Sequence, residues 1–197
     1  MQAKDKFLEK INLSIFLISL FFSHALYAEN IYEKIFNYND KLKNSSVNFI
    51  QTNLNDVQEG VIFFGDKRIK INYTQPQNIT IILSEKKGIY TNHDLEESQF
   101  FATKNSYIRF LFNVFHKEKY LEEAIVKEAK DKIEIVEDIK LDKIVYNIRL
   151  IYENDPIKLR RLEINDDNEK TQMGFFNHNL EKEIEKKFFS MVDPYLN

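Results

Sequence analysis

The stretch "QEGVIFFGDKRIKINYTQP", residues Gln58–Pro76, contains two adjoining strand-like runs of different character. In the second run, Ile69, Ile71 and Tyr73 alternate with polar residues, which is the pattern of a strand with one buried face. The first run, Val61–Phe64, is apolar on both faces. The two runs predict neighbouring antiparallel strands whose apolar surface faces either an ordinary core or a partner that is not protein.

Similar runs dominate the rest of the chain and are separated by short polar turns. They fall at residues 47–53, 78–83, 87–92, 132–136, 143–152, 159–164 and 171–178. Apolar residues at helical spacing indicate one helix over residues 31–43 and another near residues 107–114, followed by a charged segment that continues as helix or loop. Short connections favour antiparallel pairing, so we expect one sheet of about eight to eleven strands with helices at the start and middle.

The N-terminus has the pattern of a secretory signal peptide. Three lysines within residues 1–10 precede the apolar run Ile11–Phe22, and small residues follow at Ala25 and Ala28. The run is too short for a permanent membrane span. We expect residues 1–28 to be a signal peptide cleaved near Ala28, or alternatively after Ala25, and residues 29–197 to be one domain; an uncleaved anchor is the other interpretation.

The composition of the 197-residue chain is that of a globular protein, with 43% hydrophobic and 30% charged residues. The net charge is −3 and both signs are mixed along the chain, which argues against nucleic-acid binding because such proteins carry a basic stripe. The chain contains no cysteine, so it has neither disulfide bonds nor a thiol for lipid attachment. We therefore expect an exported protein that is stabilised by its core alone and is not itself lipid-anchored.

Residues with catalytic or metal-binding chemistry are few. Three histidines follow the signal peptide, and none has the spacing of a helical zinc motif. His93 and Asp94, with Glu96 and Glu97 nearby, form a candidate metal or acid–base cluster, but they lie in a polar turn where acidic side chains are usually solvated. We expect no metal, no cofactor and no enzymatic activity, and a secreted hydrolase built on His93 is the alternative.

The apolar surface of the predicted sheet is the remaining functional signal. Residues of inward parity form one broad aliphatic and aromatic face: Ile69, Ile71, Tyr73, Ile79, Ile81 and Leu83. Two short helices are the evident cover for this face. Sheet and helices can pack into a dry core, or they can enclose a pocket for an apolar ligand, and periodicity leaves both open.

The order of several segments resembles a known family. These segments are the first helix with "SSVNFIQTN", the opening stretch, "NITIILSEKKGIYTNHDLEESQ", "NSYIRFLFN", "PIKLRRLEIND" and "KKFFSMVDP". Together they span nearly the whole chain after the signal peptide and resemble the periplasmic outer-membrane lipoprotein carrier family, LolA. No single motif is specific to this family, but the order and spacing of the segments are specific to it.

The resemblance implies a mainly β fold with α elements, an incomplete antiparallel β-barrel (half-barrel) capped by short helices. It implies a periplasmic chaperone that binds the acyl chains of lipoproteins in an apolar cavity and shuttles them from inner to outer membrane. Its implied partners are acylated lipoproteins, an inner-membrane lipoprotein-releasing ABC transporter and, where present, an outer-membrane acceptor. The carrier is expected to be a monomer. The expected lipid-binding residues are Phe49, Phe63, Ile69, Ile71, Tyr73, Ile79, Ile81, Leu83, Tyr90, Phe110 and Leu111.

The sequence departs from the family in the turn of the opening stretch. Many members carry an Arg-Pro pair there, and the Arg is implicated in closing a helical lid, whereas this chain has Gly65-Asp66. Lys67 and Arg68 are the nearby substitutes expected to contact the lid, and a solvated turn is the other interpretation. A carrier or sensor of another amphiphile such as a glycolipid, and a structural β-domain with a dry core, remain as alternative functions.

Overall fold

The strand-forming runs assemble into one curved antiparallel sheet in a computed structural model of the protein. The structure describes residues 30–54, 56–104, 108–141, 143–166, 169–180 and 184–196. Residues 31–197 form one unit, and the description below concerns that unit alone. The predicted signal peptide lies outside the described residues.

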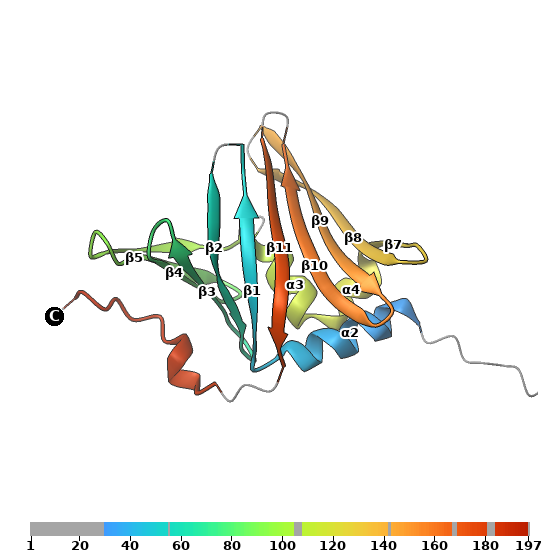
Figure 1. The fold of residues 1–197 in the computed structure, drawn as a ribbon, viewed down its shortest axis with the longest axis horizontal. Coiled ribbons are helices and arrows are strands. Elements are labelled where there is room, and N and C mark those ends of the chain that lie inside the picture. The colour runs from blue at the N-terminus through green and yellow to red at the C-terminus, as the bar shows by residue number, and fades with distance from the viewer. Residues whose placement is uncertain are drawn as a thin grey trace, which may run out of the picture. The chain divides into compact units, whose positions relative to one another are not determined.

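Eleven strands make up the described part of the sheet, and every neighbouring pair is antiparallel. They are β1 Ser45–Thr52, β2 Val57–Phe64, β3 Ile69–Gln75, β4 Ile79–Leu83, β5 Lys87–Asn92, β6 Glu97–Ala102, β7 Ile125–Glu128, β8 Lys132–Leu141, β9 Ile144–Asn154, β10 Ile157–Asn165 and β11 Lys170–Asn179. The order across the sheet is β6-β5-β4-β3-β2-β1-β11-β10-β9-β8-β7, so β1 and β11 join the two halves at the centre (Figure 1). The sheet does not close, which confirms the predicted half-barrel.

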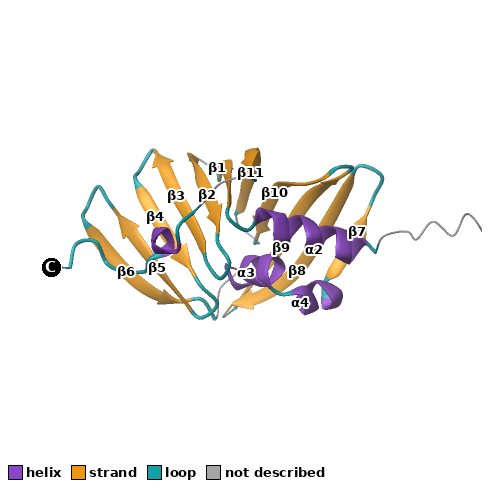
Figure 2. Ribbon diagram, turned by 90° about the horizontal axis from the view of Figure 1, so that it is seen from below, coloured by secondary structure: helices purple, strands orange, loops and turns teal. Residues whose placement is uncertain are grey.

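Three short α-helices among the described residues lie on the same side of the curved sheet (Figure 2). They are α2 Ile31–Leu42, α3 Ile108–His116 and α4 Glu118–Glu123. We call this helix-bearing side the inner face of the sheet. None of the described helices has the length and apolar character needed to cross a membrane.

The first helix ends where the sequence changes to strand-forming residues. Asn44 follows the helix with a φ of 59°, a left-handed conformation that asparagine tolerates better than most residues. Its backbone N–H donates to the carbonyl of Phe64 over 2.7 Å. This bond fixes the end of α2 against the end of β2, so the helix enters the sheet at a defined angle.

The main hydrophobic core lies between the helices and the inner face. Ile35 and Leu42 of α2, together with Phe49 of β1, are fully buried in it. Cross-strand pairs continue the inner face through β2, β3 and β4, where Ile62 lies opposite Ile71 and Ile71 lies opposite Ile81. The alternation in the opening stretch therefore places Ile69, Ile71 and Tyr73 on the inner face, as its parity predicted.

The C-terminal tail, residues 184–196, covers the outer face of β2–β5. The ring of Phe188 contacts that of Phe63 with a centroid distance of 4.8 Å, and the Lys70 ammonium lies 3.9 Å from the Phe188 centroid. Further along, the Tyr195 hydroxyl and Nδ1 of His93 are 2.9 Å apart. The apolar outer side of the Val61–Phe64 run is thus covered by the chain's own end.

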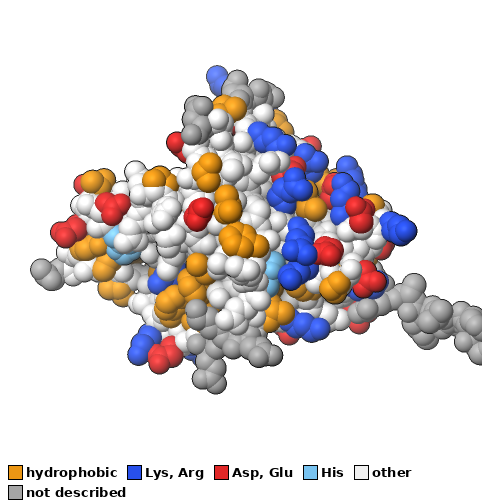
Figure 3. Space-filling model, in the orientation of Figure 1, with side chains coloured by type: hydrophobic (Ala, Val, Ile, Leu, Met, Phe, Trp, Pro, Cys, Tyr) orange, Lys and Arg blue, Asp and Glu red, His pale blue; other side chains and the backbone are white. Residues whose placement is uncertain are grey.

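The rest of the outer face carries two groups of side chains, one hydrophobic and one basic. Hydrophobic side chains lie near its middle over β1 and β11, and Lys and Arg side chains gather over β9 and β10 (Figure 3). Ile50 and Phe176 belong to the first group and are 38% and 37% exposed. In the second group, the buried carboxylate of Glu163 pairs with Arg149 over 2.8 Å and with Arg161 over 3.2 Å. The basic side chains of this face are therefore partly neutralised by the sheet itself.

Candidate functional site

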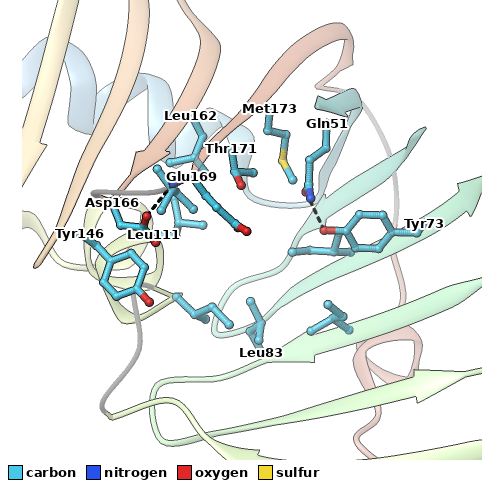
Figure 4. A pocket seen from close by; sticks show the side chains of 14 residues that line it. Gln51, Tyr73, Leu83, Leu111, Tyr146, Leu162, Asp166, Glu169, Thr171 and Met173 are labelled. Carbon is cyan, nitrogen blue, oxygen red and sulfur yellow. Dashed lines mark hydrogen bonds between the residues drawn. The ribbon is translucent and has the colours of Figure 1, made fainter. Parts of the chain in front are cut away.

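Side chains from both halves of the sheet and from α3 surround a cavity of about 270 Å³ on the inner face. Its apolar wall consists of Ile71, Tyr73, Ile81, Leu83, Ile108, Leu111, Tyr146, Leu162, Ile164 and Met173. The remaining lining residues are polar: Gln51, Asp166, Glu169 and Thr171. Figure 4 shows these side chains converging from different elements on one space.

The polar part of the cavity wall is held by hydrogen bonds between neighbouring residues. The Tyr73 hydroxyl donates to Oε1 of Gln51 over 3.0 Å (Figure 4). Nε2 of Gln51 in turn donates to Oε1 of Gln58 over 3.1 Å. On the other side, the backbone N–H of Glu169 donates to Oδ1 of Asp166 over 2.7 Å (Figure 4). The cavity therefore offers an apolar wall and a fixed polar rim, which together suit an amphiphilic ligand.

We call α3 the lid helix, because two of its side chains line the cavity on the helical side. Ile108 and Leu111 point into the cavity wall, while Phe110 and Val114 are buried in the core. The ring of Phe115 packs on that of Phe64 at a centroid distance of 4.8 Å. The lid helix thus lies on the same inner face that lines the cavity.

A buried polar group holds the lid helix to α2 and to β9. Nδ2 of Asn39 donates to the carbonyl of Val114 over 2.9 Å, and its Oδ1 accepts from the Tyr152 hydroxyl over 3.1 Å. Burial raises the pKa of the Tyr152 hydroxyl well above its usual value, so this hydroxyl stays protonated and able to donate. Polar contacts at this depth specify one position of the helix against the sheet.

A second polar contact joins the end of the lid helix to the turn between β2 and β3. Nε2 of His116 donates to the carbonyl of Gly65 over 3.1 Å, and Nδ1 lies 3.2 Å from the carbonyl of Phe112. Burial lowers the pKa of His116; the two carbonyls and Asp66 oppose this shift and the ammonium of Lys43 adds to it. The closed lid therefore favours the neutral imidazole.

The structure brings five of the eleven predicted lipid-binding residues to the cavity wall: Ile71, Tyr73, Ile81, Leu83 and Leu111. Phe49, Ile69 and Phe110 lie in the adjoining packed core, and the Phe49 ring meets that of Tyr73 edge-on at 5.1 Å. Ile79 and Tyr90 share the inner face, since they pair with Tyr73 and Ile81, but they lie outside the cavity.

Phe63 is the one expected lipid-binding residue that the structure places on the opposite face of the sheet. It alternates with Ile62 and Phe64, which belong to the inner core, so its side chain points to the outer face and contacts Phe188. The strand is apolar on both sides because the helices cover one side and the C-terminal tail covers the other. The tail follows an ordinary β-strand in the sequence, and nothing in its pattern indicated which face it would cover.

The two residues expected to contact the lid occupy the turn differently. β3 begins at Ile69, so Lys67 lies in the preceding turn, and it is exposed. The Arg68 guanidinium donates to the carbonyl of Phe189 in the C-terminal tail. The lid is instead contacted by a backbone atom of this turn, the Gly65 carbonyl, through His116, and sequence reasoning did not identify that contact.

His93 and Asp94 of the candidate acid–base cluster form hydrogen bonds with neighbouring residues. Nε2 of His93 lies 2.9 Å from the Thr80 hydroxyl, and its other ring nitrogen contacts Tyr195. Oδ2 of Asp94 accepts from the backbone N–H of Asn78 over 3.0 Å. These bonds tie the β4–β5 region to the tail and give both polar side chains hydrogen-bond partners.

The comparison with family models gives a match over most of the chain. Residues 40–192 match the model of the outer membrane lipoprotein carrier protein LolA. None of the curated protein sequences matches this chain. The matched span runs from within α2 to the C-terminal tail, so it includes the cavity, the lid helix and the turn at Gly65.

Solved structures with a similar chain path have very different sequences. An uncharacterized conserved protein from Thermus thermophilus superposes with a TM-score of 0.51 at 6% identity, covering 84% of this chain and 97% of that one. MucB of Pseudomonas aeruginosa, solved with MucA, gives 0.46 at 8% identity, covering 82% and 60%. LprF from Mycobacterium bovis gives 0.35 at 10% identity, covering 79% and 95%. The first of these likenesses supports the fold.

Proposed function

Because this chain belongs to the outer membrane lipoprotein carrier protein LolA family, we propose that it is a periplasmic carrier that shelters the acyl chains of lipoproteins. The observation that carries the proposal is the apolar cavity between the inner face and the lid helix. Removing an acyl chain from water is favourable by about 0.8 kcal/mol per buried methylene group, so even a partly enclosed chain is held firmly.

The size of the cavity supports a closed, cargo-free state. Its volume of about 270 Å³ lies just below the range of about 300–1,000 Å³ that is typical of ligand pockets. A lipoprotein carries more acyl chain than such a space accepts. We therefore infer that cargo binding displaces the lid helix, so that acyl chains and Phe110 compete for the same inner surface.

This competition gives a carrier that releases its cargo without an energy source. Displacing the lid helix exposes the apolar area that it covers in the closed state. The free energy of that exposure offsets part of the free energy gained when the acyl chains cover the inner surface. In the proposed loaded state, Ile71, Tyr73, Ile81, Leu83 and Leu111 contact the acyl chains first. Phe49 and Ile69 join the wall as the lid helix moves.

The proposed partners follow from the same scheme. The inner-membrane ABC transporter that releases lipoproteins would load the carrier, and an outer-membrane acceptor, where one exists, would receive the cargo. Residues 1–28 would direct the chain to the periplasm before cleavage near Ala28. The cavity is formed within one chain, which supports a monomeric carrier.

Lipoprotein extraction tests the proposed function. The purified protein lacking residues 1–28 is incubated with inner-membrane vesicles that contain the transporter, ATP and a labelled triacylated lipoprotein. We expect the lipoprotein to leave the membrane and to co-migrate with the protein at a one-to-one ratio. If all of the lipoprotein stays with the vesicles while the transporter is shown to be active, the carrier proposal is wrong.

The His116 contact predicts that the lid opens as the pH falls. The pKa of His116 is lowered in the closed state and returns toward about 6.5 when the ring is solvated, so protonation favours the open state. We expect the affinity for an apolar fluorescent probe to rise as the pH drops below about 6.5. Equilibrium titrations of the probe at a series of pH values measure this effect.

Two variants separate the lid from other titrating groups. His116→Gln keeps a hydrogen-bond donor without titrating in this range, so the pH dependence of probe binding should disappear. His178→Gln is the matched control, because burial and the nearby Lys158 lower the pKa of His178 to about 4 and the side chain lies outside the cavity. A pH dependence that survives in His116→Gln and vanishes in His178→Gln would contradict the role of His116.

A further inference from the structure

A second hollow lies beside the cavity, and we call it the basic groove. It has a volume of about 720 Å³ and lies where α2 and the lid helix end, between the β2–β3 and β4–β5 turns. Three aromatic side chains give it an apolar floor: Phe36, Phe112 and Phe115. The groove shares no lining residue with the cavity.

Positive charge dominates the wall of the basic groove. Six cationic side chains and three carboxylates line it among the described residues, a surplus of three, in a chain whose net charge is −3. Two of the carboxylates already have partners within the wall. Asp40 pairs with Lys43 over 2.5 Å, and Glu85 pairs with Lys117 over 2.6 Å.

Among the residues that the structure describes, the groove cations without a carboxylate partner come from the two turns. Lys67, Lys86 and Lys87 are exposed, and Arg68 donates to a neutral carbonyl, which leaves its charge uncompensated. Asp66 is the carboxylate that remains among them. The C-terminal ends of α2 and the lid helix add about half a negative charge each, so the groove keeps a surplus of about two positive charges.

The basic groove and the cavity are neighbours along the same strands. On β4, Leu83 lines the cavity and the next residue, Ser84, lines the groove. Phe115 and His116 of the lid helix line the groove, and they contact the Phe64 ring and the Gly65 carbonyl. In the proposed loaded state, displacement of the lid helix breaks both contacts and opens the groove toward the cavity.

We propose that the basic groove binds the phosphate headgroup of an anionic lipid whose acyl chains enter the cavity. The inference rests on the proposed function, since it uses the same cavity, and it extends the cargo from lipoproteins to phosphate-bearing amphiphiles. Clustered Lys and Arg side chains supply the charge-assisted hydrogen bonds that phosphate oxygens accept.

The aromatic floor favours a lipid headgroup over a free anion. A phosphate in solution gains nothing from Phe112 and Phe115, whereas the glycerol and first methylene groups of a lipid cover these rings. The adjoining apolar cavity then receives the chains. The groove supplies positive charge and the adjoining cavity supplies apolar surface. An anionic lipid presents a charged headgroup followed by apolar chains, which matches this arrangement.

The test compares two ligands with the same acyl chains. Dioctanoylphosphatidylglycerol carries the phosphate and dioctanoylglycerol lacks it, and each is titrated against the purified protein by displacement of an apolar fluorescent probe. We expect the phosphate lipid to bind at least about tenfold more tightly, with the preference shrinking as the NaCl concentration rises. Equal affinities for the two ligands would overturn the proposal.

Charge-reversal variants locate the preference. Lys86→Glu/Lys87→Glu changes two groove cations outside the cavity wall, and we expect it to lose the preference while it still binds dioctanoylglycerol and lipoprotein. Lys130→Glu/Lys140→Glu makes the same change of charge at two exposed positions outside the groove and should keep the preference. Loss of the preference in both double variants would show a general charge effect and contradict the site.

The remaining outcomes separate this proposal from the carrier function. Inorganic phosphate that binds as tightly as the phosphate lipid would show a free-anion site and overturn the lipid assignment. Lipoprotein extraction without any preference for phosphate lipid leaves the carrier function standing and removes the groove proposal. A groove-dependent preference in a protein that extracts no lipoprotein supports the groove and removes the lipoprotein proposal.

Discussion

Replacing Gly60 with alanine is expected to destabilise the protein by about 3 kcal/mol and to lower its Tm by about 10 °C. A Cβ atom at this position of β2 would lie 2.1 Å from the backbone oxygen of Asn72 and 2.7 Å from the ring of Phe49. The first contact involves backbone of the neighbouring strand, which cannot move without breaking the ladder. Thermal and denaturant unfolding measure the loss.

The same position also matters for the cavity. Gly60 lies between its two cross-strand partners, Phe49 and Tyr73, whose rings meet edge-on across it. Without a side chain at Gly60, the two rings approach to 5.1 Å, and Tyr73 is held where it lines the cavity. We expect Gly60→Ala to weaken apolar-probe binding as well as stability.

Alanine substitutions at two other strand glycines are expected to cost less stability than Gly60→Ala. At Gly174 the nearest atom to an added Cβ is the backbone oxygen of Ile50 at 3.9 Å, so Gly174→Ala should be neutral or stabilising by up to about 1 kcal/mol. At Gly88 the neighbour is the ring of Phe101 at 2.4 Å, a side chain that can turn away, and the expected loss is about 1 kcal/mol. Equal losses at Gly60 and Gly174 would contradict the steric explanation.

Ile71→Glu is expected to reduce cargo and apolar-probe binding by at least about tenfold while the sheet stays folded. Ile71 lies in the middle of the inner row between Ile62 and Ile81, is 7% exposed and lines the cavity. An unpaired carboxylate there is poorly solvated and leaves no favourable place for an acyl chain. Circular dichroism, unfolding and probe titration of one preparation separate binding from stability.

The matched control for Ile71→Glu is the same substitution at Ile50. Ile50 also belongs to a central strand, but its side chain is 38% exposed on the outer face. Ile50→Glu should therefore leave binding within about twofold of the unmodified protein, with a stability change within about 1 kcal/mol. If Ile71→Glu unfolds the protein while Ile50→Glu does not, Ile71 is part of an ordinary core and the cavity is not a binding site.

Alternation and turn signals predicted the strands that lie away from the two edges of the sheet. β3 and β5 were found within a residue or two of their ends, since Ile69, Ile71 and Tyr73 alternate cleanly and Lys87–Asn92 is bounded by turns. The two strands that the sequence did not indicate, β6 and β7, are the edges of the sheet. Most of their side chains are exposed, so burial imposes little alternation on them.

Only one wall of the candidate site could be predicted from the sequence. The inner face of β3 and β4 follows from alternation, whereas the opposite wall comes from β9–β11, where a register shift between Leu159 and Arg161 interrupts the period. The contact of His116 with Gly65 joins a side chain to a backbone carbonyl 51 residues away. Such a contact depends on how the helix lies across the sheet, which local pattern does not encode.

The open edges of the sheet have a mechanical consequence. A closed barrel has a circumference fixed by its strand number and stagger, so its interior cannot grow without breaking strand pairs. Here β6 and β7 are not paired with each other, and the sheet can flatten or tighten through small changes of twist at each of its ten ladders. The capacity of the interior can then be adjusted to cargo of different bulk while every ladder hydrogen bond is kept.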